Sequence, residues 1–469
     1  MGLSISNTSE CPDYWLTPEE QVNDTISAYE ASDIIFARQS EFSLKCQNPL
    51  DELEQAAPGT SITCPLALPE WEPLTCGTNF SIHYTTVDID STSEQIPAQN
   101  LTMRYVTAGN PDSLLGTIIL LPGLGSNVLA LTPFITSLAK SGFYVVAIDP
   151  PGFGESSWIH DADNNLVSTN SFDGMLPVTE AVTAGTAAVI RTLNLNNAIL
   201  AGYSMGGALT QSILHRHTDL PISKAILIAS AGTDGQILEP PIMLDLMAMA
   251  VDGSHEAMAR SVAMTEFSIF DPAMTFMNSN FIGSDTRVRL ETAAPYTYDA
   301  NRPEISANVF ANRFFAVDFA DAAMQSPDLL AYQLEIQNSI DVPTLVIRID
   351  NDSVIQEPMS QGLAKTISDS TYVVIEHPNG THALPLTHPS PLTKVIFDYQ
   401  IGFIPQTGIK TDELLLDTNA YQTTDDIFAP QCIEIPYLRY NSESPDLGYQ
   451  ADKFSTPLFA DSDFECNSD

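Results

Sequence analysis

The sequence predicts an α/β protein with a doubly wound, mostly parallel sheet, one helical insertion and an extension at each end. Short apolar runs typical of strands alternate with longer stretches of helical periodicity. Such alternation implies right-handed crossovers, which place helices on both faces of a parallel sheet. A second observation is a serine between glycines at a strand-to-helix junction, where the chain must turn sharply.

The alternation begins near residue 80 and can be followed run by run. Three extended segments open the predicted sheet: FSIHYTTVDI, LTMRYVTAG and GTIILLP. Helical stretches then alternate with YVVAI, AILAG and KAILIAS, and the pattern resumes at VPTLVIRID. A last helix is predicted for PLTKVIFDYQIGF. Because 44% of the 469 residues are hydrophobic, the chain can bury a large core, and no cofactor or metal is expected.

The segment AILAGYSMGG places Ser204 between Gly202 and Gly206. Glycines two positions away relieve crowding on a tight turn and leave the serine oxygen exposed. Ser204 is therefore the candidate nucleophile. The alternative is a serine at the start of a helix in a domain without catalytic activity, because a bare GxSxG pattern also arises by chance.

Four further segments appear in the order that α/β-hydrolases use, so the chain resembles that superfamily over roughly residues 78–405. TIILLPGLGSN ends in a glycine-rich loop, and YVVAIDPPGFGES contains a turn that Asp149 and Ser156 are expected to hold. VPTLVIRIDNDSVI resembles the strand that delivers the catalytic acid, and EHPNGTHALPLTHPSPL resembles the histidine loop. The order serine, acid, histidine is the order expected for this fold.

The resemblance implies a catalytic triad of Ser204, Asp352 and His382, with an oxyanion hole formed by the backbone N–H groups of Leu124 and Met205. A serine hydroxyl needs a base to become a good nucleophile, and a neutral imidazole is suited to that role near neutral pH. The aspartate would hold the imidazole in the required tautomer.

The chain departs from the family pattern at two places. Ile349 stands where the acid strand usually has a glycine, so Asp350 remains a rival to Asp352 as the triad acid. Pro122 and Gly123 replace the His-Gly pair that usually opens the oxyanion loop. This second departure keeps open the alternative of a ligand-binding protein on a hydrolase fold without turnover.

The resemblance also divides the chain. Residues 1–77 are predicted to form an N-terminal extension, residues 78–232 and 339–405 the two parts of the hydrolase core, residues 233–338 a helical cap, and residues 406–469 a C-terminal extension. Within the cap, four apolar residues fall at helical spacing: Met243, Leu246, Met247 and Ala250. These side chains and the methionines that follow pack the cap internally or line an adaptable apolar acyl pocket.

The net charge of the chain limits the kinds of ligand and partner that it is expected to bind. The chain has 18 Lys and Arg against 59 Asp and Glu, which gives a formal net charge of −41. Such a chain repels nucleic acid and anionic membranes, so a small neutral or cationic substrate is expected. No apolar run approaches the ~20 residues that a membrane-spanning helix needs, and the sequence does not indicate an oligomeric state.

All six cysteines lie outside the hydrolase-like segment, which indicates disulfide bonds in the two extensions: Cys11, Cys46, Cys64, Cys76, Cys432 and Cys466. Free thiols in a cytosolic protein are the alternative. A disulfide-bonded, strongly acidic chain is typical of a secreted or periplasmic protein, although no signal peptide is visible in this sequence.

Together these observations predict a serine hydrolase that cleaves carboxylic esters through an acyl-enzyme intermediate. A peptidase, an amidase or a lactonase would use the same three catalytic side chains, so these alternatives remain open.

Overall fold

The computed structural model describes residues 61–62, 80–123, 127–128, 131–164, 172–230, 232, 327–352, 354–377, 382, 384–404 and 432–457. Four features predicted from the sequence fall outside these residues. They are Leu124, the N-terminal extension except residues 61–62, the cap from residue 233 to residue 326, and the side chains of all six cysteines.

The described strands form one sheet, and they are β1 (Ser61–Ile62), β2 (Phe80–Ile89), β3 (Gln99–Ala108), β4 (Thr117–Leu121), β5 (Tyr144–Ile148), β6 (Ala198–Tyr203), β7 (Ile222–Ile228), β8 (Thr344–Ile349), β9 (Ser370–Glu376), β10 (Cys432–Asn441) and β11 (Tyr449–Pro457). Their order is β1-β2-β3-β5-β4-β6-β7-β8-β9-β10-β11. Neighbours from β5 to β10 are parallel, whereas β1 to β3 and β11 pair antiparallel. The predicted mostly parallel sheet is confirmed.

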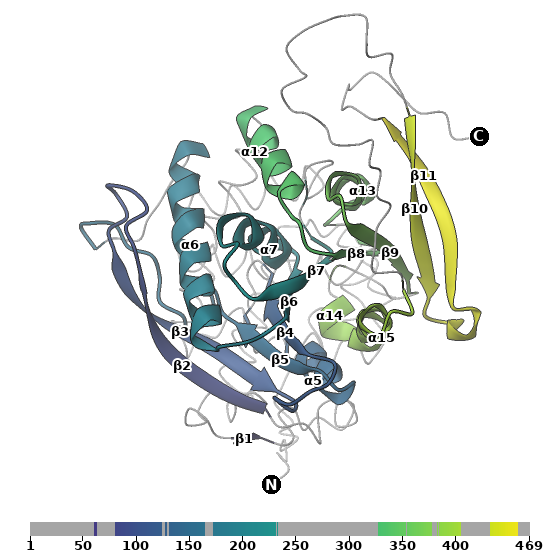
Figure 1. The fold of residues 1–469 in the computed structure, drawn as a ribbon, viewed down its shortest axis with the longest axis horizontal. Coiled ribbons are helices and arrows are strands. Elements are labelled where there is room, and N and C mark those ends of the chain that lie inside the picture. Colours follow the sequence, from purple (N-terminus) through teal and green to yellow (C-terminus); the bar gives the residue numbers. More distant parts are fainter. Residues whose placement is uncertain are drawn as a thin grey trace, which may run out of the picture.

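Helices cover both faces of this sheet, as a doubly wound fold requires (Figure 1). One face carries α6 (Phe172–Thr192), α7 (Met205–Arg216), α12 (Pro327–Asn338) and α13 (Glu357–Thr366). The other face carries α5 (Thr132–Lys140), α14 (Leu384–Thr387) and α15 (Pro389–Gln400). The loops that follow the carboxyl ends of the parallel strands lie at one edge of the sheet, where doubly wound folds place their sites.

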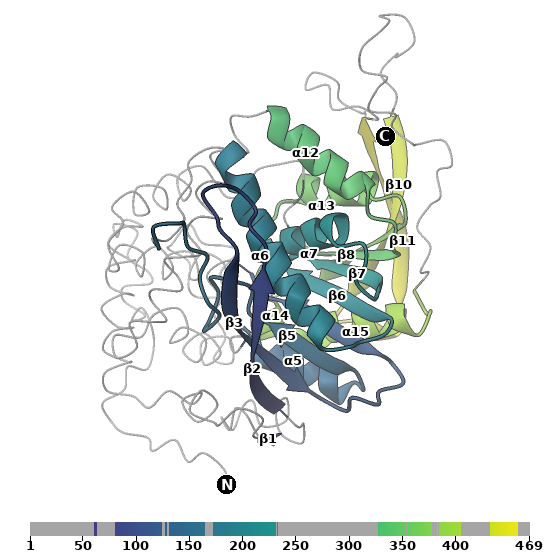
Figure 2. The same cartoon turned by 60° about the vertical axis from the view of Figure 1, so that its left-hand side comes forward.

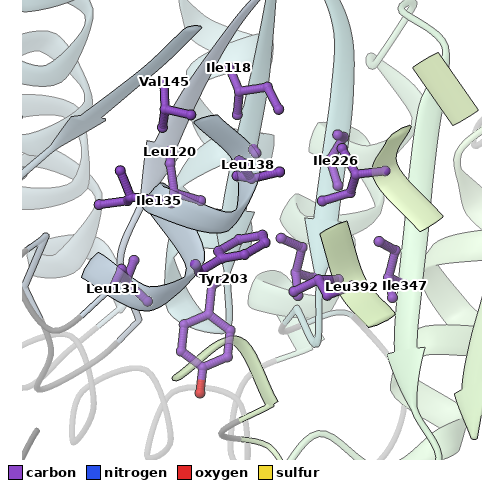
Figure 3. Packing of buried hydrophobic residues seen from close by; sticks show 14 of the residues in the cluster. Ile118, Leu120, Leu131, Ile135, Leu138, Val145, Tyr203, Ile226, Ile347 and Leu392 are labelled. Atoms are coloured by element: carbon purple, nitrogen blue, oxygen red, sulfur yellow. The ribbon is translucent and has the colours of Figure 1, made fainter. Parts of the chain in front are cut away.

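Strand β4 shows how the sequence divides between the two faces. Ile118 and Leu120 pack with residues of α5 and α15, whereas Ile119 and Leu121 pack with residues of α6 and α7. Figure 3 shows the first of these clusters, in which Leu131, Leu138 and Leu392 face the strand side chains. Successive side chains of a strand point to opposite faces, so a strand covered on both sides must be apolar throughout. This explains the continuous apolar runs in the sequence.

The C-terminal hairpin of β10 and β11 extends the sheet, although no strand is predicted there from the sequence. Its first strand pairs in parallel with β9, with Leu438 opposite Val373, and its second strand returns antiparallel. Figures 1 and 2 both show the hairpin at the end of the sheet opposite β2 and β3. Residues of the C-terminal extension therefore continue the sheet of the core.

Side chains also attach this hairpin to the rest of the sheet. The rings of Tyr437 and Phe454 lie 5.6 and 6.0 Å from the ring of Tyr372 on β9. The hydroxyl of Tyr449 on β11 donates to Oδ2 of Asp398 on α15 at 2.7 Å, and Lys394 also contacts this carboxylate. Burial, and next the bond to Asp398, raise the pKa of Tyr449 above its ordinary value, so the hydroxyl stays a donor.

A Tyr449→Phe variant is expected to lose about 1.5–3 kcal/mol of unfolding free energy, because the buried Asp398 carboxylate then loses a hydrogen bond. Urea denaturation near pH 7 measures this loss. The raised pKa means that wild type loses this stabilisation as pH rises above about 10, so the difference between the two proteins should shrink there.

The matched control for this variant is Tyr437→Phe on the same hairpin. The Tyr437 hydroxyl donates to the exposed Asp452 carboxylate at 3.1 Å, so its loss should have a much smaller effect. Equal losses in the two variants would contradict a specific role for the Tyr449 contact.

Candidate active site

Ser204 occupies a sharp turn between β6 and α7. Its backbone has φ 55° and ψ −120°, a conformation that residues other than glycine rarely adopt. Two hydrogen bonds hold the turn. The N–H of Ser204 donates to the carbonyl of Ile228 on β7 at 2.9 Å, and the N–H of Gly207 donates to the carbonyl of Ser204 at 2.9 Å. The side chain is thereby projected beyond the end of the sheet, where it is partly exposed.

The glycines around Ser204 are required by close backbone contacts. A Cβ on Gly202 would lie 2.0 Å from the carbonyl oxygen of Gly206. One on Gly206 would lie 2.5 Å from the carbonyl oxygens of Leu121 and Pro122. No side chain fits at either position, so the spacing of glycines around the serine has a steric cause.

His382 lies directly beside Ser204. Its Nε2 is 2.9 Å from Oγ of Ser204, and its Nδ1 is 2.7 Å from Oδ2 of Asp352. His382 is 2% and Asp352 6% exposed, so the contact between these two side chains is shielded from water. A carboxylate only accepts hydrogen bonds, so Nδ1 carries the proton and Nε2 is left to accept the serine proton. The three residues, far apart in the sequence, form one continuous series of hydrogen bonds.

The second oxygen of Asp352 is also fixed. Its Oδ1 accepts hydrogen bonds from the N–H groups of Val354 and Ile355, both at 2.8 Å. The N–H of Asp352 donates to the carbonyl of Ile349 at 3.1 Å, which closes a turn directly after β8. The carboxylate therefore has one oxygen held by the backbone and one directed at the imidazole.

Asp350, the rival acid, lies elsewhere. Its side chain is 48% exposed and its Oδ1 is 3.4 Å from Nη1 of Arg348. The structure thus brings Asp352, and not Asp350, to His382.

The two expected oxyanion donors are placed unequally. Met205 is the first residue of α7, and the first N–H groups of a helix have no acceptor within the helix. Leu124 lies outside the described residues. The residue before it, Gly123, is close to the nucleophile, because a Cβ there would lie 3.1 Å from Cβ of Ser204. The loop in which an oxyanion donor is expected therefore begins beside the serine.

A buried ion pair supports the end of the same loop. Arg104 on β3, which is not singled out by the sequence, donates from Nε to Oδ2 of Asp149 at 2.6 Å. Oδ1 of Asp149 accepts the N–H of Val128, five residues beyond Gly123, at 2.8 Å. The side chains of Arg104 and Asp149 are almost fully buried, with exposed fractions of 2% and 0%. As expected, Ser156 holds the turn, because its hydroxyl donates to the carbonyl of Asp149 at 2.7 Å.

Tyr203 is a second residue that the sequence does not single out. It is the last residue of β6, it is 3% exposed, and its hydroxyl donates to the backbone carbonyl of His382 at 2.9 Å. The GxSxG pattern constrains the positions two before and two after the serine, so it contains no signal for the position directly before it.

Two further searches of the described residues give negative results. No group of three or more His, Cys, Asp or Glu side chains is arranged there to hold a metal ion. None of the described helices is long and apolar enough to cross a membrane.

A doubly wound sheet with a serine on a sharp strand-to-helix turn, joined in series to a histidine and an aspartate, defines the class of α/β-hydrolases. The family model of the alpha/beta hydrolase fold matches residues 116–389, which is more than half of the chain. The chain therefore belongs to the alpha/beta hydrolase fold family.

The chain is also similar to individual proteins. The chain is 33% identical over 114 residues to the AB hydrolase superfamily protein YisY of Bacillus subtilis, a match that covers 24% of this chain and 37% of YisY. It is 24% identical over 267 residues to the bifunctional esterase/perhydrolase DCH of Acinetobacter calcoaceticus, covering 54% and 80% of the two chains. Among solved structures, it is similar to 2-hydroxy-6-oxo-6-phenylhexa-2,4-dienoate hydrolase from a Rhodococcus species, with TM-score 0.47, 19% identity and coverage of 67% and 99%.

Proposed function

We propose that the protein is a serine hydrolase that cleaves carboxylic esters through an acyl-enzyme intermediate. The observation that carries this proposal is the series of hydrogen bonds from Ser204 Oγ through the His382 imidazole to Asp352, at 2.9 and 2.7 Å. The first distance lies within the range that proton transfer from the nucleophile to its base requires, and the second is a hydrogen bond that orients the base.

The first half of the reaction acylates the serine. Nε2 of His382 takes the proton of Ser204 Oγ as the oxygen bonds to the ester carbonyl carbon, and Asp352 stabilises the imidazolium that forms. The tetrahedral intermediate then collapses and the bond to the alcohol breaks. The alcohol leaves with the proton from His382, and the acyl group stays on Ser204.

The second half of the reaction releases the acid. Water enters where the alcohol has left, gives a proton to Nε2 of His382 and bonds to the acyl carbon. The bond between this carbon and Ser204 Oγ breaks, and the serine recovers its proton from the imidazolium. One ester and one water are consumed, one alcohol and one acid are released, and the three side chains return to their starting state.

The negative charge on the substrate oxygen needs hydrogen-bond donors in both halves. We assign this role to the N–H groups of Met205 and Leu124. Met205 begins α7, so the positive end of the helix dipole favours an anion at this place. Loss of one such donor typically costs about 3–4 kcal/mol of transition-state stabilisation.

The choice of an ester is supported by the name of one relative, an esterase/perhydrolase, and by the ordinary chemistry of this type of site. A net charge of −41 favours a neutral or cationic substrate over an anionic one. Lactones and amides are the alternative acyl donors, and they require no change in the roles assigned to the three side chains.

A fluorophosphonate probe tests the proposal, because it reacts only with a serine activated by its base. Wild type is expected to be labelled rapidly at Ser204 and to hydrolyse p-nitrophenyl esters. The acyl chain length that gives the highest kcat/KM then indicates the acyl group of the preferred substrate. Ser204→Ala should lose both activities. Ser360→Ala is the matched control, since Ser360 is buried on α13 and makes no hydrogen bond within the described part of the chain. An unlabelled wild type would favour the ligand-binding alternative.

A further inference from the structure

Tyr203 lies where three elements of the candidate site meet. Its ring belongs to the apolar cluster between the sheet and α5, and Figure 3 shows the hydroxyl pointing away from that cluster. This hydroxyl donates to the backbone carbonyl of His382 at 2.9 Å. A tyrosine on the nucleophile strand is thus joined directly to the residue that carries the base.

The ring of Tyr203 makes two further contacts. Its centroid is 5.1 Å from that of the His382 imidazole, with the planes tilted by 35°. On the side of the oxyanion loop, a Cβ on Gly123 would lie 3.2 Å from Cδ1 and Cε1 of the ring. The ring therefore contacts both Gly123 and the imidazole, and a side chain at residue 123 would require the ring or Ser204 to shift by a few tenths of an ångström.

A phenylalanine would fill the same apolar space. The hydroxyl adds only the polar contact, and a buried hydroxyl is favourable only where it finds a partner. Here the partner is the backbone of His382, whose ring must stay aligned with both Ser204 and Asp352. Reacting groups tolerate little displacement, because a misplacement of 1 Å can cost about 100-fold in rate.

We propose that Tyr203 is a positioning residue that fixes the distance of the His382 imidazole from Ser204 through the backbone carbonyl of His382. This inference rests on the proposed function for its kinetic consequence, although the geometry it describes exists without substrate. Tyr203 does not touch the reacting atoms. Because Tyr203 directly precedes Ser204 and is hydrogen-bonded to His382, a movement of the turn that carries Ser204 also moves His382.

The test is a Tyr203→Phe variant, which removes one oxygen and keeps the ring. Its kcat is expected to fall about 10-fold with KM unchanged, which is less than the loss from a full 1 Å misplacement. The rate of fluorophosphonate labelling at Ser204 should fall by the same factor. A variant that is merely less stable would show unchanged kcat and KM per folded molecule, measured well below its unfolding temperature.

Tyr372→Phe is the matched control. Tyr372 is also 3% exposed, and its hydroxyl makes no hydrogen bond among the described residues. This variant should match wild type in kcat, KM and labelling. If Tyr203→Phe also matches wild type, or if both variants fall equally, the inference is wrong.

A measurement without substrate separates this inference from the proposed function. The Nδ1 proton between His382 and Asp352 should give a far-downfield proton NMR signal, assigned by its absence in His382→Ala. The signal is expected to shift or broaden in Tyr203→Phe and to stay in place in Tyr372→Phe. An unaltered signal together with an unaltered kcat would overturn the positioning role. An altered signal in a protein that cleaves no ester would instead refute only the proposed function.

Discussion

An Asp352→Asn variant is expected to lose about 10,000-fold in kcat, equivalent to about 5 kcal/mol of transition-state stabilisation, while folding normally. Oδ1 of Asp352 accepts two backbone N–H groups, so the asparagine oxygen must remain at that place. Its NH₂ group then faces Nδ1 of His382. A donor there forces the imidazole proton onto Nε2, and this tautomer cannot take the proton of Ser204.

Ester hydrolysis and phosphonate labelling measure this loss, and Asp350→Asn is the matched control. Asp350 differs from Asp352 by two positions, but its side chain is half exposed and pairs with Arg348. Its replacement should leave kcat within about twofold of wild type, because effects of exposed charges outside the site are small. A large loss in Asp350→Asn with little change in Asp352→Asn would reverse the assignment of the acid.

An Arg104→Met variant is expected to lose about 3–5 kcal/mol of unfolding free energy, because the Asp149 carboxylate would stay buried without its partner. Methionine keeps most of the apolar volume, so the loss reports the missing charge. Arg191→Met is the control. Arg191 pairs with Asp219 at 2.8 Å, but the two side chains are 44% and 60% exposed, and such a surface pair contributes under about 1 kcal/mol.

The Arg104 variant should also show a distinctive pH dependence. Burial raises the pKa of Asp149, and Arg104 is the first of the groups that oppose this rise. The pKa of Arg104 is raised as well, because the neighbouring carboxylates outweigh its burial. Of the two partners of this ion pair, only Asp149 can lose its charge under conditions where the protein folds, so the direction of its pKa shift decides the outcome.

Without Arg104, the pKa of Asp149 should lie higher still in the folded state than in the unfolded state. A raised folded pKa stabilises the protein at low pH and loses that effect as pH rises. The deficit of Arg104→Met relative to wild type should therefore shrink as pH falls from 8 to 5. Denaturation curves across this range measure it, and a deficit that grows toward low pH would show that Asp149 is not the responsible group.

Much of the fold could be predicted from local sequence patterns. The runs FSIHYTTVDI and YVVAI coincide with β2 and β5 residue for residue. The parallel strand β5 is buried on both faces after its first residue, so its apolar run ends where the strand ends, whereas the antiparallel β2 includes exposed positions. The serine turn could also be predicted, because the backbone clashes that demand Gly202 and Gly206 involve near neighbours in the chain.

Features that depend on distant contacts could not be predicted. The resemblance favours Asp352 over Asp350 as the acid, but the contact that distinguishes the two, between Asp352 and His382, joins residues 30 positions apart. Tyr203 acquires its role from a carbonyl 179 positions away. The strands β10 and β11 contain many polar residues, and their place beside β9 is set by tertiary packing.

The C-terminal hairpin also determines how the sheet meets its surroundings. Without β10, the outermost strand would be β9, whose five central residues are buried and whose backbone would be open to lateral pairing with another copy. With the hairpin in place, the outermost described strand is β11, which exposes Asp452 and Lys453 near its centre. Charged side chains on an edge strand disfavour its pairing with a strand of another molecule. The hairpin thus covers the edge of β9 and ends the described sheet with charged side chains, which disfavour strand pairing between copies of the chain.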